Sequence, residues 1–505
     1  MMRNRSLVPV ILAAALAPLP AHPQATLGAE WRDDVERFAR SLVEAHLLPG
    51  MGLAVTQGDR VVYSRAFGLA DAASGRHADE GTAFYIASST KALTATAVLA
   101  LAARKELDLD ASIAHYLPAL RGRVDLNADS ITLRHLLTMS HGIEASGAVE
   151  FRTAYSGVFS SDLLLELLAE YRQSPSARQF RYGNLGYNIL GLVLDSRNGH
   201  GWKDVVRREV LEPLGMRETS ARVSDFEFHA IAQPHDYGAD GRFQRIRLAK
   251  ADANMHAAGG HFATPRDLAR FVAAHASSGR IEGVQAFPRE IIASAHRKQI
   301  EQNRRFGPFH RFGWGYGWDL GTYGDETVVQ RFGAFSGYRS HMSFIPDRGT
   351  GVVVLVNGSG PASDAADVMA TYIYDRLRGT PNLDVAYKLR MMDLRALADA
   401  RRYNLANDSA ERRARVAPLP HPLQDYAGVY ENAKLGGMEC RVVDARLECR
   451  IGVAASAAEV FDARQNQFSV RLTGDREVVA FTFLPAGGSA RSLHYRGETF
   501  KRVND

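Results

Sequence analysis

The stretch Phe84-Tyr85-Ile86-Ala87-Ser88-Ser89-Thr90-Lys91 decides how the rest of the chain is interpreted. From Thr90 to Arg104 apolar residues recur at three- and four-residue spacing, which predicts that Ser88 lies at the start of a helix. Because residues three apart share one face of a helix, the Ser88 hydroxyl and the Lys91 amine fall within hydrogen-bonding reach. The stretch therefore predicts a serine nucleophile with a lysine beside it.

A serine three residues before a lysine is weak evidence by itself. An ordinary amphipathic helix with Ser88 or Ser89 as its N-cap would show the same residues. Lysine can take a proton from serine only when its pKa falls from ~10.4 towards 7 or 8, which requires burial and a neighbouring cation. Catalysis at Ser88 thus predicts a closed site that contains a second positive charge.

Strand patterns stand at both ends of the region from about 30 to 380. Gly52–Phe67 and His341–Val356 each alternate apolar and polar residues around a turn, as antiparallel hairpins do. The run Val352–Val356 is apolar throughout, which predicts a central strand covered on both faces. Helical patterns lie between and after the hairpins, at Thr90–Arg104, Ser161–Tyr171, Leu185–Arg197, Pro265–His275 and about Ser363–Leu377. This order predicts an α/β fold with a sheet core and a mostly helical subdomain.

The pattern changes after Pro381. An Arg-rich helical stretch ends near Val416 and three prolines follow, so we expect a partly helical linker over 381–422. From Leu423 onward the sequence predicts short alternating strands at Tyr426–Tyr430, Met438–Val443, Phe468–Leu472 and Val478–Phe483. These strands indicate a separate, small all-β domain over 423–505, of barrel-like type.

The chain contains 2 cysteines, Cys440 and Cys449. If Asp444-Ala445 is a two-residue hairpin turn, the two cysteines stand opposite each other in a non-hydrogen-bonded pair, with Cα atoms ~4.5 Å apart. That spacing predicts a Cys440–Cys449 disulfide; the alternative is two buried free thiols.

Composition and charge exclude several classes of protein. The 505 residues are 46% hydrophobic and 23% charged, as in a soluble globular protein, and not as in a disordered, collagen-like or small disulfide-stapled chain. The net charge of +5 comes from interspersed acidic and basic residues, so we expect no nucleic-acid partner.

Residues 1–25 combine a basic start, the apolar run Leu7–Leu19 and small residues at Ala21 and Ala25. This pattern predicts a cleaved signal peptide and a periplasmic or secreted protein. The alternative is an uncleaved membrane anchor, although the apolar run is shorter than the ~20 residues a span needs. We expect no transmembrane segment after signal removal.

Two further motifs give the first stretch its context. Tyr182-Gly183-Asn184 follows Ser88 by about ninety residues, and Arg331-Phe332-Gly333-Ala334 runs towards a strand. Together, in this order, the three motifs resemble those of the penicillin-recognising serine hydrolases, which include class C β-lactamases, D-alanyl-D-alanine carboxypeptidases, D-aminopeptidases and esterases. The resemblance covers about 30–380, within a hydrolase domain expected over 26–380. It implies a class C β-lactamase-like antiparallel sheet flanked by helices.

The resemblance also implies roles for individual residues. Ser88 would be the acylated nucleophile, Lys91 its activating partner and Tyr182 a second proton-transfer group. The backbone N–H groups of Ser88 and Ala334 would form the oxyanion hole. The substrate-binding residues would be Asn184, which orients the substrate amide, together with Arg331 and Gly333.

Arg331 departs from the pattern, because relatives have Lys or His at this position. A guanidinium attracts anions and lowers the pKa of neighbouring groups such as Lys91 and Tyr182, but it cannot itself exchange a proton. Two alternatives follow. Arg331 binds a free C-terminal carboxylate of the substrate, or a carboxylate of the protein holds its side chain, which then only closes the site.

No metal or organic cofactor is expected. The histidine pairs His256/His261 and His135/His141 lack zinc-site spacing and are interpreted as core or surface residues, and no phosphate-binding loop follows a strand. The C-terminal domain resembles the small lipocalin-like modules appended to some members of the family, through Tyr426–Tyr430 and Leu435-Gly436. Such a module can stabilise the hydrolase, shape the active-site entrance, or bind a ligand or partner.

The sequence therefore predicts an exported serine hydrolase that forms an acyl-enzyme with a peptide, ester or β-lactam carbonyl of a small-molecule or peptide substrate. One alternative is a penicillin-fold binding or sensor protein with little turnover. A second gives the β domain the main role, with the hydrolase as a platform. The sequence does not indicate an oligomeric state.

Overall fold

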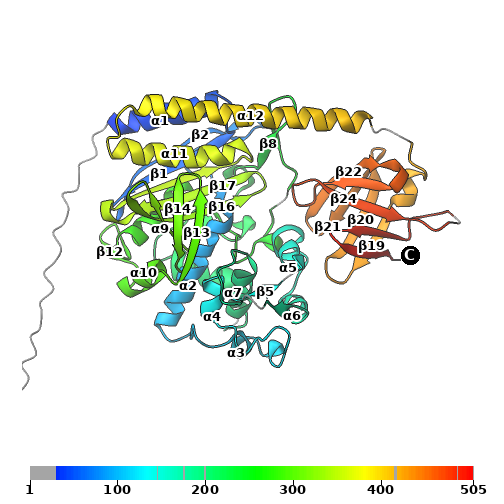
Figure 1. The fold of residues 1–505 in the computed structure, drawn as a ribbon, viewed down its shortest axis with the longest axis horizontal. Helices are drawn as coiled ribbons and strands as arrows, with labels where there is room; N and C mark the ends of the chain where they lie inside the picture. Colours follow the sequence, from blue (N-terminus) through cyan, green and yellow to red (C-terminus); the bar gives the residue numbers. More distant parts are fainter. Residues whose placement is uncertain are drawn as a thin grey trace, which may run out of the picture.

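The computed structural model describes residues 30–144, 146–174, 177–197, 201–248, 250–414, 418–485 and 487–503, so the predicted signal peptide at 1–25 lies outside the described residues. Figure 1 shows a large α/β domain beside a smaller β domain, with one long helix running across the top of both. Within the described ranges, no helix is both long and apolar enough to span a membrane.

A nine-stranded antiparallel sheet forms the centre of the large domain, in the order β13-β14-β15-β16-β17-β18-β1-β2-β3. Both predicted hairpins are present and join the N-terminal end of the region to its C-terminal end, because β1 pairs with β18. The strands are β1 (Gly50–Gln57), β2 (Arg60–Asp71), β3 (Arg76–His77), β13 (Ile300–Phe306), β14 (Phe309–Trp314), β15 (Asp319–Tyr323), β16 (Glu326–Phe335), β17 (Tyr338–Ile345) and β18 (Thr350–Val356).

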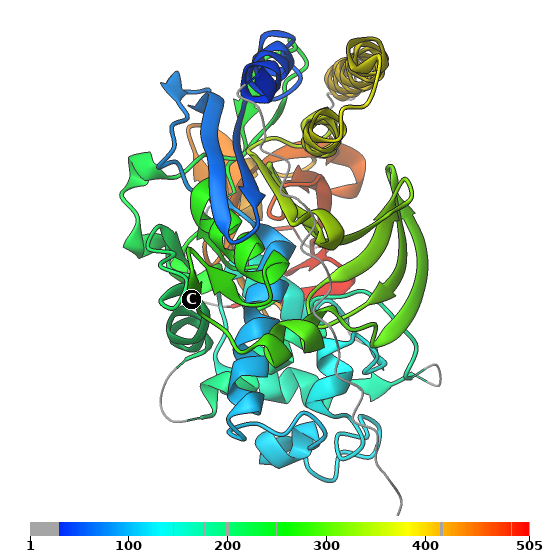
Figure 2. The same ribbon diagram turned by 90° about the vertical axis from the view of Figure 1, so that its left-hand side faces the viewer.

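The central strand β18 is covered on both faces, as its apolar run predicts. Val353 and Leu355 point into one core and Val352, Val354 and Val356 into another. Helix α9 (Pro265–Ala276) packs on the first face, while α11 (Pro361–Leu377) and α1 (Glu30–Glu44) cover the second (Figure 2).

The mostly helical subdomain lies between β3 and β13 in sequence and shares the core of the first sheet face. Its helices are α2 (Thr90–Ala103), α3 (Ile113–Tyr116), α4 (Leu133–Leu137), α5 (Ala148–Glu150), α6 (Ser161–Ala169), α7 (Leu185–Asp195) and α8 (Trp202–Val206), and α10 (Arg289–His296) follows α9. Short strand pairs complete it: β4 (Phe84–Tyr85) and β7 (Thr219–Ser220) on either side of β10 (Phe262–Ala263), β5 (Ile143–Glu144) with β6 (Arg172–Gln173), β8 (His235–Tyr237) with β9 (Phe243–Arg245), and β11 (Arg280–Ile281) with β12 (Val284–Gln285). The predicted helices begin and end within about two residues of these bounds.

The segment predicted as a linker is mainly one helix, α12 (Leu383–Ala414). Tyr387, Leu394 and Ala398 of α12 are buried in the core of the second sheet face, against α11. These residues recur at helical spacing, so the Arg-rich stretch has a buried apolar stripe as well as a solvated face. Most of 383–414 therefore belongs structurally to the hydrolase, in contrast to the expected linker.

The C-terminal domain is a closed antiparallel barrel. Its strands are β19 (Gly428–Asn432), β20 (Gly436–Val443), β21 (Arg446–Ile451), β22 (Ala454–Asp462), β23 (Gln467–Val470), β24 (Glu477–Thr482), β25 (Ser492–Tyr495) and β26 (Glu498–Arg502). Cys440 lies opposite Cys449 in the β20–β21 hairpin, in the predicted register, and the two form a disulfide. Buried aromatic side chains occupy the barrel interior, namely Tyr426, Tyr430, Phe468, Phe481, Tyr495 and Phe500.

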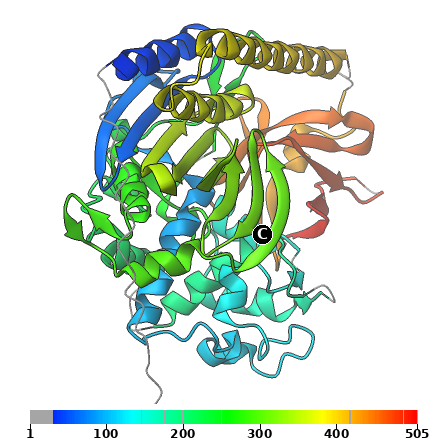
Figure 3. The ribbon, with the colours of Figure 1, turned by 60° about the vertical axis from the view of Figure 1, so that its left-hand side comes forward.

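The barrel docks on the helical subdomain (Figure 3). Phe151, in the π-helix η3 (Phe151–Ser156), is part of the barrel's apolar core, and Arg152 donates hydrogen bonds to the carbonyl oxygens of Lys434 and Ala433 at 2.7 and 3.0 Å. These apolar and polar contacts both come from η3, which helps to hold the barrel beside the hydrolase.

Candidate active site

Ser88 lies in a short 3-10 turn, η1 (Ala87–Ser89), that leads directly into α2. Ala87, the residue before it, has φ +45°, a left-handed conformation that costs a non-glycine residue of the order of 1 kcal/mol. Ser340 on β17 holds the turn, since its hydroxyl donates to the Ile86 carbonyl at 2.7 Å and hydrogen-bonds Ser89 at 2.8 Å. The strained turn presents Ser88, half-buried, to the cavities described below.

Lys91 is fully buried and uses all three of its donors. Its Nζ donates to Ser88 Oγ at 3.1 Å, Asn184 Oδ1 at 2.6 Å and the Ala258 carbonyl at 2.8 Å. Burial, helped by the Arg331 charge and opposed by Tyr182, lowers the pKa of Lys91 to about 8. The two atoms that the sequence placed one helical turn apart are therefore in contact, and the amine is close to the pKa required of a base.

Tyr182 reaches the same point from the loop before α7. Burial alone would raise the pKa of its phenol, but the charges of Arg331 and Lys91 and a hydrogen bond with Ser88 lower it to about 8. The Arg331 guanidinium donates to the phenol oxygen. Lys91 and Tyr182 thus titrate in the same range, so a proton can move between them through Ser88.

Strand β16 brings Ala334 beside the nucleophile. A Cβ atom on Gly333 would lie 2.0 Å from the Ile86 carbonyl oxygen, so only glycine allows the strand to approach η1 this closely. Ser88 and Ala334 consequently line the same two cavities. The predicted oxyanion-hole residues are brought together, and Gly333 serves the site through its close packing.

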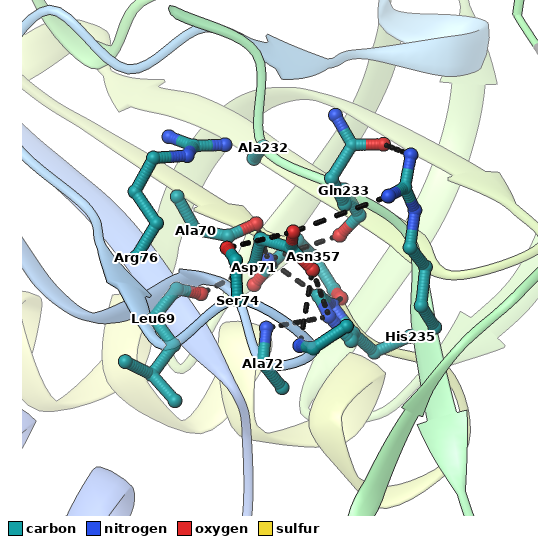
Figure 4. A network of polar contacts seen from close by, with 12 residues as sticks. Leu69, Ala70, Asp71, Ala72, Ser74, Arg76, Ala232, Gln233, His235 and Asn357 are labelled. Carbon is teal, nitrogen blue, oxygen red and sulfur yellow. Dashed lines mark hydrogen bonds and ion pairs between the residues drawn. The ribbon is translucent and has the colours of Figure 1, made fainter. Parts of the chain in front are cut away.

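Figure 4 shows a polar network around Asn357, the residue that follows β18. The Asn357 amide at the end of β18 donates to the carbonyl oxygens of Leu69, Ala70 and Gln233 at 3.1, 3.0 and 3.0 Å. The Tyr338 hydroxyl donates a hydrogen bond to the carbonyl oxygen of Ala232, the residue before Gln233, at 2.8 Å. Asn357 therefore links β2 to the segment that contains Ala232 and Gln233, and this segment contacts the start of β17.

Arg331 is held by the protein itself. Nη1 donates to the Asp319 carboxylate at 3.0 Å, Nε donates to the Ser88 carbonyl at 3.0 Å, and Nη2 donates to Tyr182. The side chain is 2% exposed. This geometry matches the second alternative for Arg331, in which a protein carboxylate holds it, and leaves no free fork for a substrate carboxylate.

Several residues of the site carried no recognisable motif in the sequence. Asp319 holds Arg331, and Glu150 accepts a hydrogen bond from the Asn184 side-chain amide at 3.1 Å, which orients that amide with its oxygen towards Lys91. The fold brings Asp319 and Glu150 to the site. For Asp319, the sequence offers one indication, namely that a buried arginine such as Arg331 needs a carboxylate partner.

Two cavities meet at Ser88. The larger, about 360 Å³, is lined by Glu150, Tyr155 and Phe335, and by Asp475 from the barrel loop between β23 and β24. The Ser336 hydroxyl donates to the Thr473 carbonyl at 2.9 Å and holds this loop in place. The barrel thus shapes the entrance of the site, one of the roles considered for it. The smaller cavity, about 270 Å³, opens towards Arg304, Arg311 and Arg339.

The four histidines considered for metal binding have other surroundings. His256 pairs with Asn188 at 3.0 Å, His141 accepts from the Ile143 amide at 3.0 Å, and His135 accepts from the Thr132 amide at 3.0 Å. His261 is fully buried. Among the residues whose placement is described, no group of three or more His, Cys, Asp or Glu side chains has the arrangement of a metal site.

A serine in contact with a buried lysine and a tyrosine, beside a strand amide, defines a serine hydrolase site. The chain belongs to the beta-lactamase family, whose model matches residues 35–373. It is 30% identical to esterase EstB of Burkholderia gladioli over 63% of this chain and 88% of the esterase. It is 26% identical to penicillin-binding protein 4 of Amycolatopsis lactamdurans over 67% of this chain and 88% of that protein.

Solved structures share the fold. The octameric penicillin-binding protein homologue from Pyrococcus abyssi matches with a TM-score of 0.58 and 19% identity, over 93% of this chain and 99% of that one. The D-amino acid amidase from Ochrobactrum anthropi matches with a TM-score of 0.59 and 19% identity, over 70% and 99% of the two chains. The predicted family, the fold and the assignment as a serine hydrolase are confirmed.

Proposed function

We propose that the chain hydrolyses amide or ester substrates through an acyl-enzyme on Ser88. The observation that carries the proposal is the 3.1 Å contact between Lys91 Nζ and Ser88 Oγ, with the Tyr182 phenol near enough to the same serine for Ser88 to help lower its pKa. Each of the two groups that can take the serine proton has a pKa lowered to about 8 by its surroundings. A base poised near neutral pH is what activation of a hydroxyl requires.

The cycle follows from these positions. The fraction of enzyme in which Lys91 and Tyr182 together lack one proton accepts the Ser88 proton as Oγ attacks the carbonyl carbon. The backbone N–H groups of Ser88 and Ala334 stabilise the oxyanion, a contribution of ~10²- to 10³-fold in rate per donor. Tyr182 then donates its proton to the departing nitrogen or oxygen, and water releases the acyl group by the reverse sequence.

The competing interpretation is a protein of the same fold that binds ligands with little turnover. The complete set of Ser88, Lys91 and Tyr182 contacts supports an enzyme, because a binding site has no need of a desolvated lysine against a serine. Burying a lysine costs free energy, and a catalytic role accounts for a buried lysine against a serine better than ligand binding does.

Active-site labelling distinguishes the two. A fluorophosphonate or a fluorescent penicillin should label the full-length protein, and Ser88→Ala should abolish labelling. Ser363→Ala is the matched control, since Ser363 lines the larger cavity and should leave labelling intact. A folded protein that reacts with neither probe, and that does not turn over nitrocefin, 4-nitrophenyl esters or D-amino-acid amides, would contradict the proposal.

We also propose that residues 1–25 direct export and are removed. N-terminal sequencing of the protein from a periplasmic or culture fraction should find a chain that begins near residue 26. A protein recovered only in the cytoplasm with Met1 intact would contradict this.

A further inference from the structure

Helix α12 is apolar on two opposite sides. On one side, Tyr387, Leu394 and Ala398 are buried in the core of the second sheet face. The other side carries a row of apolar residues that we call the outer stripe, namely Val385, Leu389, Met392, Ala396 and Tyr403. At ~100° per residue, these five positions fall within about 60° of one another and about 180° from the packed side chains. A helix that is apolar on opposite sides is normally covered on both.

The outer stripe is exposed in this structure. Val385, Leu389, Met392 and Tyr403 are between 59% and 67% exposed. The described residues include 15 exposed large apolar side chains; five of them are on α12, and every other described element or loop carries at most one. Figures 1 and 3 show the sheet domain and the barrel on the same side of α12, so the outer stripe faces away from both. Such a concentration marks a contact surface, in contrast to single apolar residues scattered over a surface.

A row of cations borders the outer stripe on one flank. Lys388, Arg395 and Arg402 are seven residues apart, so they share one side of the helix, ~90° from the centre of the stripe. Lys388 and Arg395 form no hydrogen bond or ion pair with any described residue. Arg402 pairs with Asp399 within the helix. An apolar stripe beside a row of cations is typical of helices that lie flat on an anionic membrane, where long basic side chains reach the phosphate groups.

A second copy of the chain fits the outer stripe less well than a membrane does. In an antiparallel pair of α12 helices, the same flank of each helix faces the other, so the two cationic rows would meet. In a parallel pair, Asp399, which has the same heptad position as Val385 and Met392, would face its own copy. Either pairing brings like charges together, whereas an anionic lipid surface attracts the cationic row.

We propose that α12 lies flat on an anionic phospholipid membrane. The outer stripe enters the boundary between headgroups and acyl chains, and the cationic row contacts the lipid phosphates. Because the opposite side of α12 is packed on the hydrolase, the helix does not enter the bilayer further and the attachment is peripheral. The attachment goes beyond the proposed hydrolase function and does not depend on the chemistry at Ser88.

Vesicle flotation tests the proposal. The protein is used from residue 26, the mature form proposed above, so that the apolar run Leu7–Leu19 cannot itself bind lipid. It should float with phosphatidylcholine vesicles that contain phosphatidylglycerol, and much less with vesicles of phosphatidylcholine alone. Added salt should weaken the binding, because it screens the attraction between the cationic row and the anionic lipid.

Substitutions in the outer stripe test the apolar contact. Leu389→Glu/Met392→Glu should weaken binding about 100-fold, because burial of each side chain contributes about tenfold or more. The matched control is Val443→Glu/Val460→Glu, which adds two carboxylates at exposed apolar positions of the barrel and should bind like the native protein. Urea unfolding at native concentrations of urea shows that each variant is folded.

Substitutions beside the stripe test the electrostatic contact. Lys388→Gln/Arg395→Gln should weaken binding to the anionic vesicles by roughly fivefold per charge and leave the weak binding to phosphatidylcholine unchanged. Asp393 lies next to Met392 on the exposed side of the helix, where it would be repelled by anionic lipid. Asp393→Asn should therefore strengthen binding, by about fivefold.

Three results would overturn the proposal. The first is a native protein that does not float with the anionic vesicles, and the second is equal flotation of Leu389→Glu/Met392→Glu and the native protein. The third is a native dimer, measured by light scattering, that binds no vesicles and that Leu389→Glu/Met392→Glu converts to a monomer; this result would assign the outer stripe to a second copy. Labelling by serine-directed probes is a separate measurement, so loss of the hydrolase function would leave the flotation result valid.

Discussion

Arg331→Met removes the cation that bonds Tyr182, and its effect on the pH profile can be calculated. The guanidinium carbon lies 5.0 Å from the centre of the phenol ring. At that distance and an effective dielectric constant of ~20, two unit charges interact by about 3 kcal/mol, which corresponds to roughly two pH units in a pKa. Loss of the cation destabilises the phenolate, so the pKa of Tyr182 rises from about 8 by about that amount.

The pKa of Lys91 moves in the same direction, since Arg331 also lowers it. The active enzyme is the form in which Lys91 and Tyr182 together have lost one proton. The acidic limb of the plot of log kcat/KM against pH should therefore move to higher pH by about two units. At pH 7 the rate should then fall about 100-fold, and it should recover towards pH 10. Stopped-flow or plate assays with a neutral ester across pH 5 to 10 measure this.

A second variant and a stability measurement separate charge from structure. Arg331→Lys keeps the positive charge and should leave the acidic limb within about half a pH unit of the native position. Arg331→Met leaves the buried Asp319 paired with Arg311 alone, so unfolding in urea should show a loss of stability, and the pH profile is measured on protein that this titration shows to be folded. An acidic limb that stays in place in the folded Arg331→Met variant would refute the electrostatic account.

Three other substitutions test how the site and the barrel are built. Gly333→Ala should reduce kcat by at least 100-fold, because its Cβ would lie 2.0 Å from a carbonyl of the nucleophile turn, whereas Gly437→Ala, whose Cβ meets open space, should be neutral; steady-state kinetics of the two compare them. Asn357→Ala should lower the free energy of unfolding by about 3 kcal/mol, as three buried carbonyls lose a donor, and a urea titration that shows less than 1 kcal/mol would contradict this. Cys440→Ser/Cys449→Ser should destabilise the barrel by about 2 to 3 kcal/mol without changing labelling of the nucleophile; thermal unfolding with and without reductant gives the measurement.

Local patterns predicted the elements that have a strong period. Val352–Val356 has no polar residue and is the central strand with a core on each side, and the helix from Thr90 begins where the apolar spacing begins. The β20–β21 register followed from counting outward from a two-residue turn, in which Asp444 and Ala445 both have positive φ. In each case the information lies within about fifteen neighbouring residues.

The parts that were not predicted depend on tertiary contacts. Asp319 and Glu150 reach the site from segments without a motif, and nothing near them in sequence indicates their partners. The sequence predicts a partly helical linker over 381–422; the many charged residues of this stretch conceal the buried apolar stripe by which α12 packs on α11. Arg331 left two alternatives open until the fold placed a carboxylate against it.

The continuity of α12 has a mechanical consequence. Asp408, near the C-terminal end of α12, pairs with Arg476, the neighbour of Asp475. The length of α12 therefore helps to set where the barrel loop that carries Asp475 lies relative to Ser88. Each residue inserted between the part of α12 packed on α11 and Asp408 would advance the helix by ~1.5 Å and rotate Asp408 by ~100°. An insertion of one or two residues in α12 would turn Asp408 away from Arg476 and so displace the loop from the cavity. An insertion of seven residues makes nearly two full helical turns, so Asp408 would keep its direction and only its distance along the helix axis would change.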